Sequence, residues 1–381
     1  MELLTRGVSE IIGREELERK LSSGAKLRVK LGIDPTSPDL HLGRAIPLLK
    51  LRDFQQAGHT VVFIVGDFTA VIGDTSDKDS ERPMLSREEI EHNQKSYFEQ
   101  AGKLIDLDKA ELRYNSEWLG PLTYREIGEQ ADEFSVADFI ARDNIKRRLD
   151  EGKRVSLREV LYPLMQGYDS VAVKADVELG GTDQRFNLLA GRVLQEKYGQ
   201  APQSLVISPL IEGLDGRKMS SSWGNTISLT ATPSDMYGKV MSMRDESIRT
   251  YLELCTRVPL NEVEEISKLH PKEAKMRLAR ELVSMYHSTE AADGAEKDFV
   301  ETFAHKGVPT DVPTVKVAKE DLMADVLVRE GVVASKTEWR RLISEGAVKN
   351  AETGAPITSP DASVEELTIK VGKHRFVRFE F

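Results

Sequence analysis

Short runs of β-branched and aromatic residues alternate with longer amphipathic runs in the first part of the chain. The length of each run, and its period of two or of 3.6 residues, separates buried strands from helices. The pattern predicts strands at 27–34, 60–66 and 171–179, and helices at 42–56, at about 86–106, and from glycines 180–181 to about 197. Strands that alternate with helices predict an α/β fold with a Rossmann-like, doubly wound parallel sheet, whose ligands bind beyond the carboxyl ends of its strands.

The pattern changes after about Leu229. Residues 232–235 have the form of a capped helix start, and Pro271 opens another strongly helical run. Residues 307–314 contain two prolines and no apolar period, which predicts a linker. A chain of 381 residues is too long for one ordinary core. We therefore predict three domains: a Rossmann-like domain at 1–229, a helical domain at 230–312 and a small α+β domain at 313–381.

Composition narrows the class of protein. Hydrophobic residues make up 40% of the chain and charged residues 30%, which is the balance of a folded globular protein. No apolar run approaches the roughly 20 residues that a membrane span needs, and residues 1–20 predict a charged amphipathic helix in place of a signal peptide. A single cysteine, Cys255, fits a reducing compartment. We expect a cytoplasmic protein with no membrane partner.

The formal charge of −10 is adverse for a protein that binds nucleic acid. The charge is unevenly distributed, because residues 315–381 carry eleven basic and eleven acidic side chains and 370–378 is locally basic. A local basic patch can bind phosphate against an adverse overall charge, although it gains little long-range steering.

The first candidate site follows the strand at 27–34, in the sequence Asp34-Pro-Thr-Ser-Pro-Asp39-Leu-His41-Leu-Gly43-Arg44. The prolines prevent helix until about Asp39, so we expect His41 in the first turn of a helix with Arg44 on the same face. Helix N-terminal amides and two basic side chains make an anion site, and Gly43 lets a flat ring approach the backbone. For this motif alone, a solvated helix start with an incidental histidine is the alternative.

The second candidate site is a loop with the sequence Gly213-Leu-Asp-Gly-Arg217-Lys218-Met219-Ser-Ser221-Ser. Its glycines favour mobility. Its cations and serines can close over a polyphosphate and stabilise the charge that develops as pyrophosphate leaves. An ordinary surface loop is the alternative.

Taken together, the two motifs resemble the signatures of the class I aminoacyl-tRNA synthetases. The first corresponds to the family's HIGH motif and the second to its KMSKS loop, in the order and separation of the tyrosyl and tryptophanyl branch. Arg44 stands in place of the second histidine, and Ser221 in place of the second lysine. The resemblance assigns ATP binding to Thr36, His41, Gly43, Arg44, Gly181, Asp183, Lys218, Met219, Ser220 and Ser221. It assigns catalysis to His41, Arg44, Lys78, Arg82, Lys218 and Ser221.

A third motif, Tyr162-Pro-Leu-Met-Gln166-Gly-Tyr-Asp169, resembles the Y-x-x-x-Q-x-x-D helix of the tyrosyl branch. Spacings of four and three residues place the three polar side chains on one helix face. The resemblance implies that Asp169 accepts a hydrogen bond from the substrate's phenol, while Tyr162 and Gln166 hold its amino group. A buried acceptor that phenylalanine leaves unpaired gives roughly 10⁴–10⁵-fold discrimination. An amphipathic helix with a polar edge is the alternative.

Further positions match the tyrosyl branch, although each is weak alone. Asp74 corresponds to the carboxylate that pairs with the substrate ammonium, Gln184 to a side chain that faces the tyrosine, and Asp183 to the group that binds ribose hydroxyls. Lys78 and Arg82 correspond to mobile-loop cations that steady the pyrophosphate.

Lys30 departs from the pattern of the tyrosyl branch, in which many members have a tyrosine near the substrate phenol. We expect Lys30 to belong to the tyrosine-binding site. Either Asp169 recognises the phenol with less help than in those members, or Lys30 adjusts the ionisation of Asp169.

The end of the chain resembles an S-four type RNA-binding domain. Residues 322–343 predict two short helices, and 346–350 predict a turn and a strand. Lys336, Arg340 and Arg341 have spacings suited to one helix face, where contact with RNA phosphates is the implied role. A solvated basic helix in a small structural domain is the alternative.

The resemblance as a whole implies an enzyme that activates L-tyrosine with Mg²⁺-bound ATP and transfers it to tRNA(Tyr), as a homodimer formed through about residues 130–145. Scattered histidines and one cysteine have no metal-ligand spacing, so we expect no protein-bound metal. A non-catalytic RNA-binding paralogue is the alternative that Arg44 and Ser221 motivate, and an intact tyrosine pocket argues against it. Altered amino-acid specificity, suggested by Lys30, is a lesser alternative.

Overall fold

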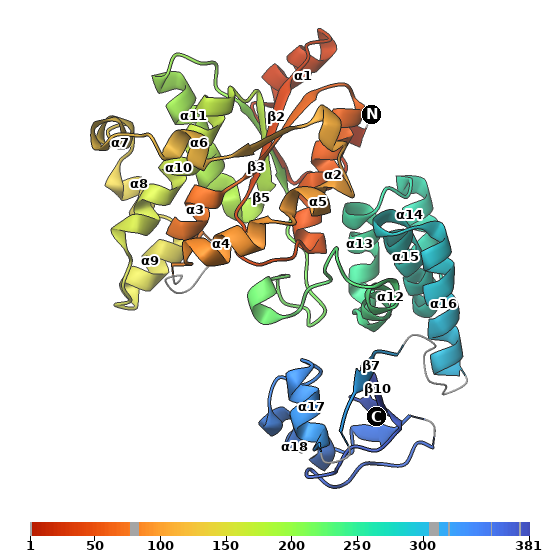
Figure 1. Cartoon of the computed structure of the whole chain (residues 1–381). Coiled ribbons are helices and arrows are strands. Elements are labelled where there is room, and N and C mark those ends of the chain that lie inside the picture. The colour runs from red at the N-terminus through yellow and green to blue at the C-terminus, as the bar shows by residue number, and fades with distance from the viewer. Residues whose placement is uncertain (1, 77–83, 305–311, 319–320, 352, 373–374) are drawn as a thin grey trace.

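The computed structural model describes residues 2–381 except 77–83, 305–311, 319–320, 352 and 373–374, and only the backbone of 302–304. Its centre is a six-stranded sheet of order β1-β6-β5-β2-β3-β4 (Figure 1). The strands are β1 Glu10–Ile12, β2 Arg28–Ile33, β3 Thr60–Val65, β4 Glu111–Tyr114, β5 Val177–Gly181 and β6 Ser204–Ser208. All neighbouring pairs are parallel except β1 with β6. The expected α/β class with a doubly wound parallel sheet is confirmed.

The strand order reverses beside β2, and this reversal positions the site. From β2 the chain proceeds through β3 to β4 on one side, and later through β5 to β6 on the other. Ligands of open α/β sheets bind at such a switch point, beyond the carboxyl ends of the strands.

Helices cover both faces of the sheet. Alternate residues of β3 point to opposite faces, so Val61 and Phe63 join the core that contains Leu48 of α2, while Val62 and Ile64 pack with Val173 of α10. The helices of this part are α1 Arg14–Ser22, α2 Leu42–Gln56, α3 Asp67–Ile72, α4 Arg87–Gln94, α5 Tyr97–Gly102, α6 Ser116–Leu119, α7 Tyr124–Ala131, α8 Val136–Ile140, α9 Asp143–Asp150, α10 Leu157–Val173 and α11 Arg185–Lys197.

Two boundaries differ from the sequence-based prediction. Residues 171–173 belong to the end of α10, which Lys174 caps with φ of 50°, and the strand occupies Val177–Gly181. The apolar run was read as strand because a buried helix end has the same composition. The helical stretch expected at about 86–106 contains two helices, because α4 ends at Gln94 and α5 begins at Tyr97.

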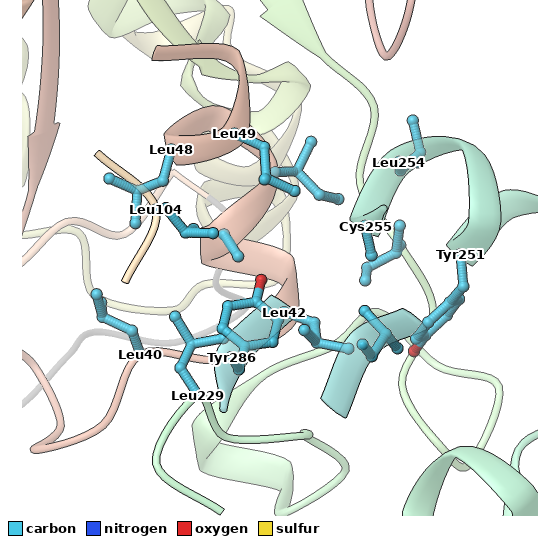
Figure 2. Close-up of a cluster of buried hydrophobic side chains, with 14 of the residues drawn as sticks. Leu40, Leu42, Leu48, Leu49, Leu104, Leu229, Tyr251, Leu254, Cys255 and Tyr286 are labelled. Carbon is cyan, nitrogen blue, oxygen red and sulfur yellow. The ribbon is translucent and has the colours of Figure 1, made fainter. Parts of the chain in front are cut away.

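Helices follow the sheet from Pro233 onward, as predicted. They are α12 Pro233–Ser242, α13 Ile248–Cys255, α14 Leu260–Ile266, α15 Pro271–Tyr286 and α16 Thr289–Ala304. Thr232 caps α12 by accepting from the Asp235 amide, as its sequence predicted. Figure 2 shows Leu49 of α2 on the side of the helix toward Leu254 and Cys255 of α13, so one apolar core runs across the proposed boundary at residue 230.

The end of the chain is a small α+β unit with a core of its own around Trp339. Its elements are β7 Thr314–Lys316, α17 Met323–Arg329, α18 Lys336–Ser344, β8 Val348–Asn350, β9 Thr368–Val371 and β10 Arg375–Glu380, with sheet order β7-β10-β9-β8. The linker expected at 307–314 lies mostly outside the described residues, and its last residue begins β7. Within the described part of the chain, no helix has the length and apolar character of a membrane span.

Candidate active site

A cavity of about 620 Å³ opens at the switch point of the sheet. Its walls come from the ends of β2, β3 and β5, the start of α2, one face of α10, and residues 208–222. These segments bring together nearly all of the residues that the sequence motifs singled out.

His41 caps α2 from outside the helix. Its backbone is extended (φ −126°, ψ 167°) and the helix begins at Leu42, so the predicted position in the first helical turn is wrong by one residue. Among the described residues, nothing bonds to its buried Nδ1. Burial, with the nearby cations of Arg44 and Lys218, lowers the pKa of His41 to about 3. His41 is therefore a neutral imidazole near pH 7.

Gly43 lets the first motif and the second approach each other. Its amide lies 3.2 Å from Met219 Sδ, and a side chain on Gly43 would start 3.1 Å from the His41 ring. The start of α2 thus contacts the 213–222 loop directly.

Arg44 forms three hydrogen bonds, two with the loop that follows β2 and one with Tyr97 of α5. One guanidinium nitrogen donates to the Asp34 carbonyl oxygen and to the Tyr97 hydroxyl, both at 3.0 Å, and another donates to Thr36 Oγ1 at 2.8 Å. A histidine could not make this set of contacts, because it lacks the planar fork of five donors. Arg44 lines the cavity and holds Thr36 beside it.

The 213–222 loop lies at the end of the cavity that is formed by the start of α2. Lys218 Nζ is 2.9 Å from Asp183 Oδ2, and Ser221 Oγ is 3.3 Å from Ser37 Oγ. Arg217 stacks on the Trp223 ring at 4.7 Å and pairs with Asp215. Hydrogen bonds from Asn225 and Arg217 lower the pKa of Asp215 to about 2.

The polar face of α10 forms the other end of the cavity, as its spacing predicted. The helix starts with a capping box at Ser156 and Glu159. Tyr162, Gln166 and Asp169 all line the cavity. The Tyr162 hydroxyl donates to Asp34 Oδ2 at 2.8 Å.

Asp169 is a buried acceptor. Trp118 Nε1 donates to its Oδ1 at 2.8 Å, and Asn115 Nδ2 donates to its Oδ2 at 3.4 Å. Burial raises the pKa of Asp169 to about 7, against the lowering effect of Lys30 and of these hydrogen bonds. Burial likewise raises the pKa of Asp34 to about 6, despite its bonds from Thr69 and Tyr162.

Asp74 and Gln184 meet beside α10. Gln184 Nε2 donates to Asp74 Oδ2 at 2.7 Å and to Ser76 Oγ at 3.0 Å. Both side chains line the cavity, as do Gly181 and Asp183 at the end of β5. Lys78 and Arg82, predicted to be loop cations, lie outside the described residues.

Lys30, expected to belong to the tyrosine-binding site, is not among the residues that line the cavity. Its side chain is fully buried on β2, and its ammonium pairs with Glu178 at 2.8 Å. Lys30, four positions before Asp34, was expected near the ligand, but on β2 its side chain lies beneath α10.

Comparison with known proteins identifies the family. Residues 22–304 match the family model for class I tRNA synthetases of the tryptophanyl and tyrosyl type (W and Y). The chain belongs to this family.

The relatives match along the whole chain. The chain is 47% identical over 400 residues to the tyrosine–tRNA ligase of Carboxydothermus hydrogenoformans, covering 100% of this chain and 97% of that one. It is 45% identical over 389 residues to the tyrosine–tRNA ligase of Thermotoga maritima, covering 99% and 96%.

Solved structures share the fold of this family member. The tyrosyl-tRNA synthetase of Archaeoglobus fulgidus complexed with L-tyrosine has a TM-score of 0.63 at 24% identity, covering 77% of this chain and 98% of that one. A C-terminally truncated mitochondrial tyrosyl-tRNA synthetase of Aspergillus nidulans has a TM-score of 0.67 at 21% identity, covering 79% and 93%.

Sequence reasoning missed four side chains that lie near Asp169 and Tyr162. They are Asp34, Thr69, Asn115 and Trp118. Asp34 had a usable signal, because a carboxylate at the end of a buried strand lies at the ligand edge. Asn115 immediately precedes the short helix α6 after β4, Trp118 lies in that helix, and neither has a local pattern of its own.

The three basic residues predicted to contact RNA lie on α18. Lys336 forms an ion pair with Asp325, Arg341 pairs with Glu345 at 2.8 Å, and Arg340 is exposed. Surface ion pairs of this kind are weak, so their cations can be drawn to phosphate.

Proposed function

We propose that this chain is a tyrosine–tRNA ligase, which forms tyrosyl-adenylate and pyrophosphate from L-tyrosine and ATP and then transfers tyrosine to the 3′ end of tRNA(Tyr). The observation that carries the proposal is one cavity with a buried carboxylate, Asp169, at one end and the two signature segments at the other. The names of the full-length relatives support it.

In this proposal Asp169 accepts a hydrogen bond from the substrate phenol, because its charged form offers only acceptors. Phenylalanine would leave this buried acceptor unpaired, which is the costly kind of mismatch. Asp74, Tyr162 and Gln166 hold the amino group, and Gln184 faces the tyrosine. The 2.7 Å bond between Gln184 and Asp74 supports this, because it orients the carboxylate beside the cavity.

We assign ATP to the end formed by the start of α2 and the 213–222 loop. All residues of this site line the cavity, and the two glycines do so with their backbone. They are Thr36, His41, Gly43, Arg44, Gly181, Asp183, Lys218, Met219, Ser220 and Ser221. Asp183 would bind the ribose hydroxyls. Neutral His41 would donate a hydrogen bond to a phosphate without a charge of its own.

The first step needs no protein nucleophile, because the tyrosine carboxylate itself attacks the α-phosphate of Mg²⁺-bound ATP. Its acceleration comes from positioning and from stabilisation of the charge on the departing pyrophosphate. Lys218 and Ser221 serve this role from the loop, Arg44 acts by holding Thr36, and Lys78 and Arg82 are proposed to assist.

In the second step a hydroxyl of the 3′-terminal ribose of tRNA(Tyr) takes the tyrosyl group from tyrosyl-adenylate, and AMP leaves. We assign the helices at 230–312 and the basic α18 of the last unit to tRNA binding, and Lys336, Arg340 and Arg341 to phosphate contact. The division of the chain at 229 and 312 belongs to this proposal, as does action in the cytoplasm.

We also propose a homodimer. Large apolar side chains are exposed in one stretch of the chain, where Tyr124 is 95% and Leu157 is 73% exposed. Val136, Ile140 and Leu149 are exposed between them. Exposed apolar side chains of this size, if they adjoin on the folded surface, are typical of a protein interface.

The test is tyrosine-dependent exchange between ATP and labelled pyrophosphate, without tRNA, with phenylalanine and tryptophan as controls. Exchange with tyrosine alone supports the ligase. Absence of exchange with every amino acid, from protein that unfolds cooperatively, would overturn it in favour of a non-catalytic RNA-binding paralogue.

A further inference from the structure

Lys30 and Glu178 form an ion pair in the interior, beneath the tyrosine end of the cavity. They are register partners on the adjacent strands β2 and β5, and their side chains are 0% and 1% exposed. Neither residue lines the cavity. The proposed reaction therefore has no direct use for either charge.

The ammonium of Lys30 has three acceptors, one for each of its hydrogens. Besides Glu178 at 2.8 Å, it donates to the Gln166 carbonyl oxygen and to Ser170 Oγ, both at 2.9 Å. Both of these contacts are with α10, on the turn that carries Asp169. The pair thus joins the two central strands to the helix that lines the tyrosine end.

Glu178 is equally well bonded. Its Oε2 accepts from Ser170 Oγ at 3.0 Å and from Gln203 Nε2, and its Oε1 lies 3.3 Å from Gln166 Nε2. This last bond fixes the amide of Gln166, because the nitrogen faces Glu178. The oxygen is then the atom that Gln166 offers to the cavity.

The crossing of α10 and α11 is shaped around this cluster. A side chain on Gly191 of α11 would start 2.5 Å from Gln203 Nε2 and 3.0 Å from Ser170 Oγ. A side chain on Gly167 of α10 would start 2.9 Å from the Ala190 backbone. Two glycines therefore give the polar cluster its room.

Stability alone is a weak explanation for the pair. Burial of two charges costs about as much as their attraction returns, so a well-packed apolar pair of similar volume is often as stable. The effect of these fixed charges on the binding site above them is a better explanation for the pair. Lys30 also acts on Asp169, because its positive charge is the strongest of the effects that lower the pKa of that carboxyl against burial.

We propose that Lys30 and Glu178 are a positioning pair that sets the tyrosine end of the cavity in an accepting form. Gln166 then offers its carbonyl oxygen to the ligand's amino group and Asp169 offers its carboxylate to a hydroxyl, so the site selects a ligand with a hydroxyl donor. This inference rests on the proposed function, since the ligand is tyrosine there. Lys30 and Glu178 touch no substrate.

The experiment compares the double variant Lys30→Met/Glu178→Gln with the wild-type chain. The double variant removes both charges together, so it leaves no lone buried ion. The measurements are the thermal midpoint of unfolding and the ratio of kcat/KM for tyrosine over phenylalanine in pyrophosphate exchange. We expect a midpoint close to that of the wild type. We expect the selectivity ratio to fall about tenfold or more, through a higher KM for tyrosine with little change in kcat.

A control separates this effect from the loss of any buried lysine. Lys50 of α2 is buried, donates to the Leu3 carbonyl oxygen and pairs with Asp53, outside the cavity. Lys50→Met should lower the thermal midpoint and leave the selectivity ratio unchanged.

A second readout does not depend on activity. Trp118 donates to Asp169, so tryptophan fluorescence reports the protonation of that carboxyl, and the part of the pH titration missing in Asp169→Asn belongs to it. The charged groups that act on Asp169 are Lys30 from β2 and Glu178 from β5. The carboxylates of Asp34, Asp74 and Asp169 all act on Tyr162, whose hydroxyl donates to Asp34. In the double variant the midpoint of the fluorescence titration should move to higher pH. The reason is that Lys30 lowers the pKa of Asp169 more than Glu178 raises it.

The outcomes are distinct. A double variant with wild-type selectivity and a wild-type fluorescence midpoint would reduce the pair to a packing role and overturn the proposal. If the double variant does not fold, Ser170→Ala decides, because it keeps both charges and removes the hydroxyl between them. An unchanged ratio of kcat/KM for tyrosine over phenylalanine would then overturn the proposal, and a lower ratio would support it. Absence of exchange in the wild type is a failure of the proposed function instead, and the fluorescence midpoint then decides alone.

Discussion

Lys218 Nζ and Asp183 Oδ2 form an ion pair of 2.9 Å across the nucleotide end of the cavity. Both side chains are partly exposed, so the pair is of the modest strength that a ligand can replace. In the proposed reaction Asp183 binds the ribose and Lys218 the phosphates. ATP must therefore separate the two groups, and the loop changes partners when the nucleotide binds.

The first prediction concerns Lys218→Met. It removes a cation that acts on the charge developing at pyrophosphate, so we expect kcat for pyrophosphate exchange to fall on the order of 10²–10³-fold. The KM for tyrosine should change little, because Lys218 is at the other end of the cavity. Steady-state exchange at varied tyrosine and ATP measures both constants.

Lys239→Met is the matched control, since Lys239 forms a surface pair with Asp235 on α12 and does not line the cavity. It should leave both constants unchanged. Equal effects of Lys218→Met on tyrosine binding and on turnover would refute a transition-state role for the loop.

The second prediction concerns the pH dependence of stability. Burial raises the pKa of Asp169 from an ordinary value of 3.8 to about 7, so the folded chain holds its proton between these limits and the unfolded chain does not. The contribution of Asp169 to stability is therefore complete below pH 3.8 and is lost as pH rises through about 7. Asp169→Asn should remove this loss.

Denaturant unfolding of the ligand-free wild type and Asp169→Asn at pH 5 and pH 8 measures the effect. The variant should gain stability relative to the wild type between these pH values, by about 1–3 kcal/mol. The same variant should lose discrimination against phenylalanine. A constant stability difference at the two pH values would mean that Asp169 does not titrate in this range.

The sequence predicted the sheet and the two signature segments because both depend on local patterns. The strand at Thr60–Val65 and the helix at Leu42–Gln56 have a clear period, and the face formed by Tyr162, Gln166 and Asp169 follows from helical geometry alone.

What the sequence could not predict depends on contacts between distant segments. Lys30 was expected near the ligand, but its partner Glu178 is 148 positions away and the pairing of β2 with β5 creates the contact. Trp118 reaches Asp169 across 51 positions, and nothing in its neighbourhood indicates this. His41 lies outside the helix, where its extended backbone forms an isolated antiparallel bridge with Ser228, and this one-residue shift is finer than periodicity resolves.

The third prediction tests Arg44, which replaces a histidine of the family motif. Its fork holds the Asp34 carbonyl, Thr36 and Tyr97 at once, and lysine cannot bond in two directions in the same plane. Arg44→Lys should lower stability by about 1–3 kcal/mol and raise the KM for ATP, because the loop with Thr36 loses its support. Denaturant unfolding and exchange kinetics measure the two effects. Arg14→Lys, at an exposed pair on α1, should change neither.

The last prediction tests the assignment of α18 to RNA. Arg340 is exposed on the same helix as Lys336 and Arg341, far along the chain from the cavity. Arg340→Glu reverses a charge where phosphate contact is proposed, so it should weaken binding of tRNA(Tyr) and flatten its salt dependence. Pyrophosphate exchange without tRNA should keep its wild-type rate, because adenylate formation takes place in the cavity.

Arg19→Glu makes the same charge change on α1, at the opposite end of the molecule from α18 (Figure 1). It carries an equal change in net charge, so any difference between the two variants comes from position and not from long-range repulsion. Filter binding of tRNA(Tyr) at several salt concentrations compares them. If Arg340→Glu and Arg19→Glu weaken binding equally, α18 makes no specific phosphate contact, and its basic face is a solvated surface of a structural unit.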